Sequence, residues 1–200
     1  MTKPIVFTKT FSAPPIDNTE ILRYAGMRAH SDEIEALLKQ CISETKGTFT
    51  YRVCWSIFPI EEVGDELDLS FARIKSKGLQ EHLAGCGQIV LFAATVGVEI
   101  DRLVARSHAL SPTKALLFNA LGIERIEALC DAFEAEVRAN AHREGKAIRR
   151  RFSPGYSDLP LALQCDVVAA LDCQRKIGLT LNQSLLLSPS KSVTAIIGIQ

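Results

Sequence analysis

The stretch Gln88-Ile-Val-Leu-Phe-Ala-Ala-Thr95 (QIVLFAAT) decides the fold class, because six apolar residues follow one another between two polar ones. A continuous apolar run of this length predicts a strand that is buried on both faces of a sheet. Residues 48–58, which end at Pro59, and residues 192–199 are rich in β-branched and aromatic residues and predict two more strands. A further strand is expected within residues 67–74.

Helices are expected on both sides of these strands. Ser31 precedes a helical apolar pattern that runs to about Ser43, and Ser111-Pro112 begins a long helix to about His142, in which a break near Gly122 stays open. Shorter helices are predicted at residues 20–24 with Thr19 as the cap, at 76–84, after Gly97 and from Pro160. The mixture predicts an α+β fold: an extended N-terminal arm at 1–18, then a single domain at 19–200 with a twisted, largely antiparallel sheet and flanking helices.

The composition is that of an ordinary globular protein. Of 200 residues, 47% are apolar and the formal net charge is zero, which argues against a general nucleic-acid or membrane-surface binder. No apolar run reaches the ~18 residues that a membrane-spanning helix needs. The N-terminus lacks the long apolar segment of a secretory signal, so we expect a cytoplasmic protein.

The six cysteines are expected to be reduced, buried thiols, and a metal or redox role is the alternative. No two of them form a C-x-x-C pair, and no histidine stands at metal-ligand spacing from another. We therefore expect no metal site. The six are Cys41, Cys54, Cys86, Cys130, Cys165 and Cys173.

The strongest candidate for a binding site is Arg149-Arg-Arg-Phe-Ser-Pro-Gly-Tyr156. Pro154 and Gly155 predict a tight turn, because proline fixes its own φ and glycine can adopt a positive one. The amides of Gly155 and Tyr156 could then point together at an acceptor, beside an arginine whose planar fork suits a carboxylate or a phosphate. The alternative is a surface loop with solvated arginines.

One helical glutamate is a second candidate. The apolar stripe of the long helix runs through Ile126, Leu129 and Phe133, and Glu127 falls just outside its edge at about 100° per residue. We expect Glu127 to be half-buried, and Asp131 and Glu124 to lie further towards solvent. The alternative is that Glu127 is one more solvated helix glutamate.

Four blocks of sequence resemble one known family, the C-terminal activation domain of cobalamin-dependent methionine synthase, and especially its short stand-alone members. The resemblance begins at about Glu20 and extends to the end of the chain. The blocks are Phe92-Ala-Ala-Thr-Val-Gly97 with Asp101, Ile126-Glu-Ala-Leu-Cys-Asp131, Arg151-Phe-Ser-Pro-Gly-Tyr-Ser-Asp-Leu-Pro160, and Ser184-Leu-Leu-Leu-Ser-Pro-Ser-Lys-Ser-Val193.

The resemblance implies that the domain binds S-adenosylmethionine. The family places an arginine and turn amides at the methionine part, a glutamate on the preceding helix, and a tyrosine that faces the corrin and serves the reaction. These roles fall on the following residues of this chain: Glu127, Arg151, Ser153, Gly155 and Tyr156. The family also uses an N-terminal aspartate, for which Asp65 and Asp68 are candidates.

The implied function is that of a reactivation subunit, which supports the reductive methylation of inactive cob(II)alamin and does not turn over alone. The chain has no D-x-H-x-x-G cobalamin element, so a partner chain supplies the cobalamin, and a flavodoxin-like protein is a possible electron donor. Two alternatives stay open. The chain either serves another corrinoid protein as activator or methyl donor, or is a non-catalytic interaction module that keeps the fold.

Overall fold

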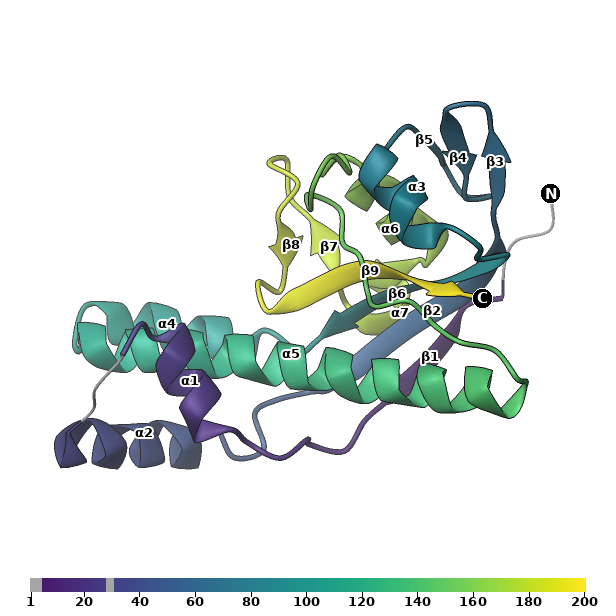
Figure 1. The fold of residues 1–200 in the computed structure, drawn as a ribbon. Helices are drawn as coiled ribbons and strands as arrows, with labels where there is room; N and C mark the ends of the chain where they lie inside the picture. The colour runs from purple at the N-terminus through teal and green to yellow at the C-terminus, as the bar shows by residue number, and fades with distance from the viewer. Residues whose placement is uncertain (1–4, 28–30) are drawn as a thin grey trace.

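The computed structural model describes residues 5–27 and 31–200 and contains a four-stranded sheet with helices on both faces (Figure 1). Each neighbouring pair of strands is antiparallel, so the predicted α+β fold with a largely antiparallel sheet is confirmed. The strand order is β1 (Phe7–Thr10), β2 (Arg52–Pro59), β6 (Gln88–Thr95), β9 (Ser192–Ile199).

Strand β6 has the predicted bounds and is buried on both faces, as expected. Val90, Phe92 and Ala94 belong to one apolar cluster of the core. The alternate residues of the strand, including Ile89 and Leu91, belong to a second cluster. Because side chains alternate across a strand, the sheet separates two apolar layers.

Helices from different parts of the chain cover these two layers. The first layer is covered by α1 (Asn18–Tyr24), α2 (Asp32–Glu44), α4 (Glu99–His108) and α5 (Pro112–Arg143). The second is covered by α3 (Lys77–Leu83), α6 (Leu163–Ala170) and α7 (Cys173–Ile177). Five short strands form two small sheets apart from the main sheet: β3 (Glu61–Val63), β4 (Glu66–Asp68) and β5 (Arg73–Ile74) form one, and β7 (Thr180–Leu181) and β8 (Leu187–Ser188) form the other.

Helix α5 crosses the whole molecule without a break (Figure 1). Ser111 caps it as predicted, and its hydroxyl accepts a hydrogen bond from the amide of Lys114. The suspected break at Gly122 does not occur. A Cβ at Gly122 would lie 2.9 Å from Cγ of Lys191 and 3.0 Å from Cγ1 of Ile100, so this glycine permits close packing.

Four predicted boundaries were wrong, and one is the start of α6, which begins at Leu163 and not at Pro160. Helix α1 is capped by Asp17 in place of Thr19, since the Asp17 carboxylate accepts the amides of Thr19 and Glu20. Strand β2 begins only at Arg52. Residues 67–74 form parts of two strands, β4 and β5, because the chain turns back where the amide of Leu69 bonds the carbonyl of Ala72 at 2.9 Å.

The stretch expected as an N-terminal arm contributes a strand to the main sheet. Within it, β1 pairs with β2 in the register Phe7 to Trp55, and the two rings stack with centroids 5.6 Å apart. Among the residues that the structure describes, no helix combines the length and apolarity needed to cross a membrane.

The cysteines divide into two groups. Four are buried, as expected, whereas Cys86 is partly exposed and Cys165 is exposed, because it lies on the outer face of α6. All six are free thiols. Within residues 5–27 and 31–200, no three His, Cys, Asp or Glu side chains are grouped so that they could hold a metal ion.

Candidate functional site

The arginine run lies along the edge of the main sheet, next to β9. The amide of Phe152 donates to the carbonyl of Ile196 at 2.8 Å, and the amide of Ile196 donates back at 2.9 Å. Earlier in the run, the amide of Arg149 donates to the carbonyl of Gly198 at 2.9 Å. This pairing fixes the backbone of Arg151 beside α5.

Arg151 is the centre of a cluster of charges. Its guanidinium lies 2.7 Å from Oε2 of Glu127, 2.6 Å from Oδ1 of Asp131 and 3.3 Å from Oε2 of Glu134. Spacings of four and three residues place these carboxylates on one face of α5. Glu134 also pairs with Arg138 at 2.9 Å. The structure therefore brings together Arg151 and Glu127, the two charged residues that the resemblance assigned to the ligand.

Burial along α5 agrees only in part with the helical pattern. The side chain of Glu127 is 38% exposed and that of Asp131 is 70% exposed, so both predictions are confirmed. Glu124 was expected near solvent and is instead buried, with its side chain 5% exposed. The apolar pattern shows one buried face, but α5 has a second, because α1 and the segment before it pack across the helix.

Glu124 is buried together with its neighbour Arg125, whose side chain is 1% exposed. The Arg125 guanidinium donates to the carbonyls of Pro14 and Pro15, each at 2.6 Å. Glu124 in turn accepts the amide of Asp17 at 3.1 Å. This ion pair therefore binds the segment before α1 to α5, over more than a hundred residues of sequence.

Arg149 is partly buried, unlike the solvated arginine of the surface-loop alternative. Its Nη2 donates to the carbonyl of Ala84 at 3.1 Å, and its Nε is buried without a partner among the described residues. The edge pairing of the run with β9 turns this side chain onto the end of α3. Arg150 is exposed, and its carbonyl lies 2.7 Å from Nε2 of His82.

The Pro-Gly turn is present, and Gly155 has the expected positive φ, +87°. The amides of Gly155 and Tyr156, however, do not point together at an open position, so that part of the prediction was wrong. The amide of Gly155 donates to the carbonyl of Leu159 at 2.8 Å, and that of Tyr156 donates to the carbonyl of Ser153 at 3.1 Å. The loop is short enough to satisfy its own donors. The amide and hydroxyl of Ser153 have no partner among the residues that the structure describes.

Tyr156 lies on the surface of this loop, with 67% of the residue exposed. Its ring meets the ring of Phe152 edge-on, with centroids 5.2 Å apart. Phe152 is itself buried and paired to β9. The tyrosine is therefore supported from one side and open on the other.

A contact that the sequence reasoning missed holds the loop to α3. The carboxylate of Asp158 accepts the Ser76 hydroxyl at 2.6 Å, the Lys77 amide at 2.7 Å and the Gly78 amide at 3.1 Å. These bonds lower the pKa of Asp158 below its ordinary value of 3.8, with the Ser76 hydroxyl as the main cause. The signal in the sequence is Ser76-Lys-Gly78, a helix start whose amides need an acceptor.

Two cavities meet at Asp131. One is a groove of about 660 Å³ between the segment 14–24 and α5, and Glu127 and Asp131 line it. The other, of about 320 Å³, is lined by Asp131, Glu134, Arg150 and Arg151. Their volumes fall in the range of small-molecule sites, roughly 300–1,000 Å³.

The groove contains two residues that the sequence did not single out, Asp17 and Tyr24. Burial and then the nearby Glu127 carboxylate raise the pKa of Tyr24. The capping pattern Asp17-Asn-Thr-Glu20 was the available signal for Asp17. Of the two aspartates proposed from the sequence, Asp68 ends β4 and pairs with Arg73, whereas Asp65 lies in the turn before β4 and pairs with Lys75. Of the three aspartates, Asp17 is the one that lines the groove of Glu127.

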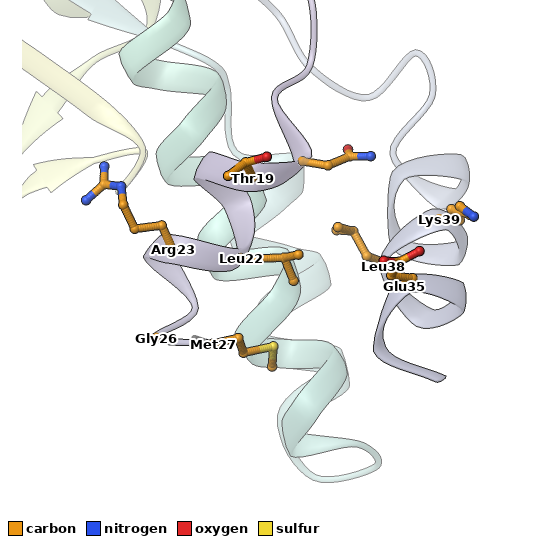
Figure 2. Close-up of a pocket in the computed structure, with 9 residues that line it drawn as sticks. Thr19, Leu22, Arg23, Gly26, Met27, Glu35, Leu38 and Lys39 are labelled. Atoms are coloured by element: carbon orange, nitrogen blue, oxygen red, sulfur yellow. The ribbon is translucent and has the colours of Figure 1, made fainter. Parts of the chain in front are cut away.

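A larger cavity, of about 790 Å³, lies between α1 and α2 (Figure 2). Leu22 and Leu38 point toward each other across it, whereas Arg23 points away. None of the site residues predicted from the sequence is among the described residues that line it. Charged groups converge instead where the groove lined by Glu127 meets the cavity lined by Arg151, and this junction is the better candidate site.

Arg151 stays charged in this cluster. Burial alone lowers the pKa of its guanidinium, but the hydrogen bonds to Asp131 and Glu127 outweigh burial, so the pKa of Arg151 is raised above its ordinary value. The site therefore offers a permanent cation beside carboxylates. Such a pair suits a zwitterionic ligand, whose carboxylate and ammonium take one partner each.

Comparison with known proteins identifies the fold. No family model matches the chain, and no curated protein matches it. Among solved structures, it is similar to the MetH reactivation domain bound to AdoHcy. That likeness has a TM-score of 0.71 and 18% sequence identity, and covers 98% of this chain and 79% of the other. The chain therefore has the fold of the MetH reactivation domain.

Proposed function

We propose that this chain binds S-adenosylmethionine and reactivates a cobalamin-dependent methionine synthase whose cobalamin is carried by a partner chain. The observation that carries the proposal is the 2.7 Å contact between Arg151 and Glu127, where the arginine-lined cavity meets the groove. The shared fold supports it, because the similar reactivation domain was bound to AdoHcy.

The ligand would bind by replacing one contact of Arg151. Its carboxylate takes the place of Glu127 on the guanidinium, and the released Glu127 accepts the ammonium group. Each such charge-assisted hydrogen bond contributes about 1.5–3 kcal/mol. The adenosine part extends into the groove beside Tyr24 and Asp17, which supplies the N-terminal aspartate that the resemblance requires.

The free amide and hydroxyl of Ser153 are the loop groups that remain available to the methionine part. Gly155 acts indirectly: its positive φ shapes the turn between Ser153 and Tyr156. We assign the loop amides of Gly155 and Tyr156 to this shaping, since both are already hydrogen-bonded.

S-adenosylmethionine carries its methyl group on a sulfonium, and the neutral thioether that departs is a good leaving group, so the chain needs no nucleophile or base of its own. The task of its residues is positioning. We propose that Tyr156, which is supported by Phe152 and open to solvent, contacts the corrin of the partner. We propose a cytoplasmic location and a flavodoxin-like electron donor for this reaction.

Calorimetry with S-adenosylmethionine tests the binding step. We expect saturable binding and a rise in melting temperature by mass action. A folded protein that shows neither at millimolar ligand contradicts the proposal.

A second assay tests the partner. Methylcobalamin should form when the chain is mixed with a cobalamin-loaded methionine synthase lacking this domain and a low-potential reductant, and not with the isolated chain. Turnover of a small-molecule acceptor by the isolated chain would instead indicate an ordinary methyltransferase. Co-purification with a different cobalamin-binding chain would favour the alternative of another corrinoid partner.

A further inference from the structure

The two cavities at Arg151 differ in charge. The smaller one is lined by Arg150 and Arg151 together with Asp131 and Glu134. The groove, in contrast, has five acidic lining residues, and none of its lining residues within the described chain is a lysine, arginine or histidine. The acidic residues are Asp17, Glu20, Glu124, Glu127 and Asp131.

Two of these carboxylates are neutralised by partners outside the groove. Glu124 is paired with buried Arg125, and Glu20 lies 2.6 Å from Arg23. Among the described residues, the Asp17 carboxylate accepts hydrogen bonds from backbone amides of α1 alone. Glu127 and Asp131 share the single guanidinium of Arg151. Negative charge is therefore in excess along the groove even when Arg151 is counted.

From this excess we infer that the groove selects the sulfonium ligand over its thioether product, S-adenosylmethionine over AdoHcy, with Asp131 and Asp17 as specificity-determining residues. The inference rests on the proposed function. Both ligands carry the same carboxylate, ammonium and adenosine, and they differ by the one positive charge on sulfur.

The geometry of the ligand places that charge near the acidic lining. Bond lengths limit the distance from an amino-acid carboxyl carbon to the sulfur of the methionine chain to about 5 Å. A ligand whose carboxylate lies on Arg151 therefore has its sulfur within reach of the field of Glu127 and Asp131. At separations of this order, each uncompensated charge changes affinity about threefold in a partly solvated site.

The selection has a consequence for turnover. When the methyl group leaves, the ligand loses its positive charge and, with it, the attraction of the groove. The product is then held less tightly than the donor, so the excess of carboxylates favours product release.

The ratio of the two dissociation constants, AdoHcy over S-adenosylmethionine, tests the inference by calorimetry on the full chain. Taking the ratio removes any effect on the shared carboxylate, including competition for Arg151. We expect the wild-type protein to prefer S-adenosylmethionine about tenfold, and the preference to shrink at high salt.

Asp131→Asn should lower the ratio about threefold, because the amide keeps a hydrogen-bonding oxygen but removes the charge. Asp17→Asn should lower the ratio similarly, because it also removes one carboxylate charge from the groove. The helix should stay capped in this variant, since asparagine also caps a helix. The matched control is Glu136→Gln, on the same helix and paired with Lys9 outside both cavities, which should leave the ratio unchanged.

Each of the other results would contradict either this inference or the proposed function. Equal affinities for both ligands in the wild type, or a ratio that neither Asp131→Asn nor Asp17→Asn lowers, would overturn the inference and leave the proposed function standing. A fall of equal size in Glu136→Gln would assign the effect to overall charge and would also overturn it. Binding of neither ligand would refute the proposed function itself.

Discussion

Asp158, in the loop after the arginine run, lies 2.6 Å from the hydroxyl of Ser76 at the start of α3, although 82 residues separate them in sequence. The Asp158 carboxylate also accepts the first two amides of that helix. The loop that carries Tyr156 is therefore held to α3 at one end and to β9, through Phe152, at the other.

The close approach of loop and helix predicts an unusual result for Gly78→Ala. Glycine to alanine in a helix normally stabilises by about 1 kcal/mol. Here the new Cβ would lie 2.8 Å from Oγ of Ser157 and 2.9 Å from Oδ1 of Asp158. We expect a net loss of about 1–3 kcal/mol in urea unfolding, the usual effect of overpacking. The control is Gly87→Ala, because a Cβ there meets nothing within 4 Å. Equal stabilities of the two variants would show that the loop moves away from the new Cβ at no cost in free energy.

The charge of Asp158 predicts how stability depends on pH. Because hydrogen bonds from Ser76 and the helix amides lower the folded pKa below 3.8, this stabilisation is complete above the unfolded pKa and disappears as pH falls through the folded one. The difference in melting temperature between wild type and Asp158→Asn should be constant above about pH 5 and shrink below about pH 4. A difference that persists at low pH would mean that charge is not its cause.

Removal of the central cation should weaken ligand binding. Arg151→Ala should lower the affinity for S-adenosylmethionine about 10- to 150-fold, the equivalent of about 1.5–3 kcal/mol for a charged hydrogen bond. Arg149→Ala should have a much smaller effect, because Arg149 donates to the carbonyl of Ala84 on another side of the loop. Equal losses in calorimetry would indicate that the run acts as a diffuse positive patch.

Tyr156 should matter for the methyl transfer and not for ligand affinity. Its ring is exposed and its amide is already bonded to Ser153, so Tyr156→Ala and Tyr156→Phe should both bind S-adenosylmethionine normally. With a cobalamin-loaded partner, the alanine variant should transfer the methyl group at least about tenfold more slowly, because small displacements at a reacting centre are costly. Loss of ligand binding or of folding in Tyr156→Ala would assign the ring a structural role.

The buried pair Glu124–Arg125 should be essential for the attachment of the segment before α1. Arg125→Met leaves Glu124 charged and unpaired in the interior and should cost about 3–5 kcal/mol in denaturant unfolding. The double variant Glu124→Leu with Arg125→Met should be less destabilised. In the single variant, hydrogen exchange at the amide of Asp17 should rise, since that amide donates to Glu124. Unchanged exchange there would show that the segment is held by other contacts.

Local sequence determined those elements whose cause is local. The bounds of β6 and β9 follow from apolar content, and the start of α5 follows from the Ser111 cap and Pro112. The positive φ of Gly155 follows from the Pro-Gly turn. The edge position of Glu127 on the helix follows from the angle of about 100° between successive residues. Each of these is set by a few neighbouring residues.

Only the tertiary structure decided which groups meet. Periodicity identifies one apolar face of α5, but the helix is covered on two, so Glu124 was placed wrongly and the buried Arg125 was not anticipated. Asp17 reaches the groove of Glu127 because Arg125 binds the backbone before α1. The amides of Gly155 and Tyr156 are hydrogen-bonded to carbonyls a few residues away. The positions of these carbonyls depend on how Asp158 holds the loop to α3. Contacts between distant segments depend on the packing of whole helices against the sheet, and no local pattern specifies that packing.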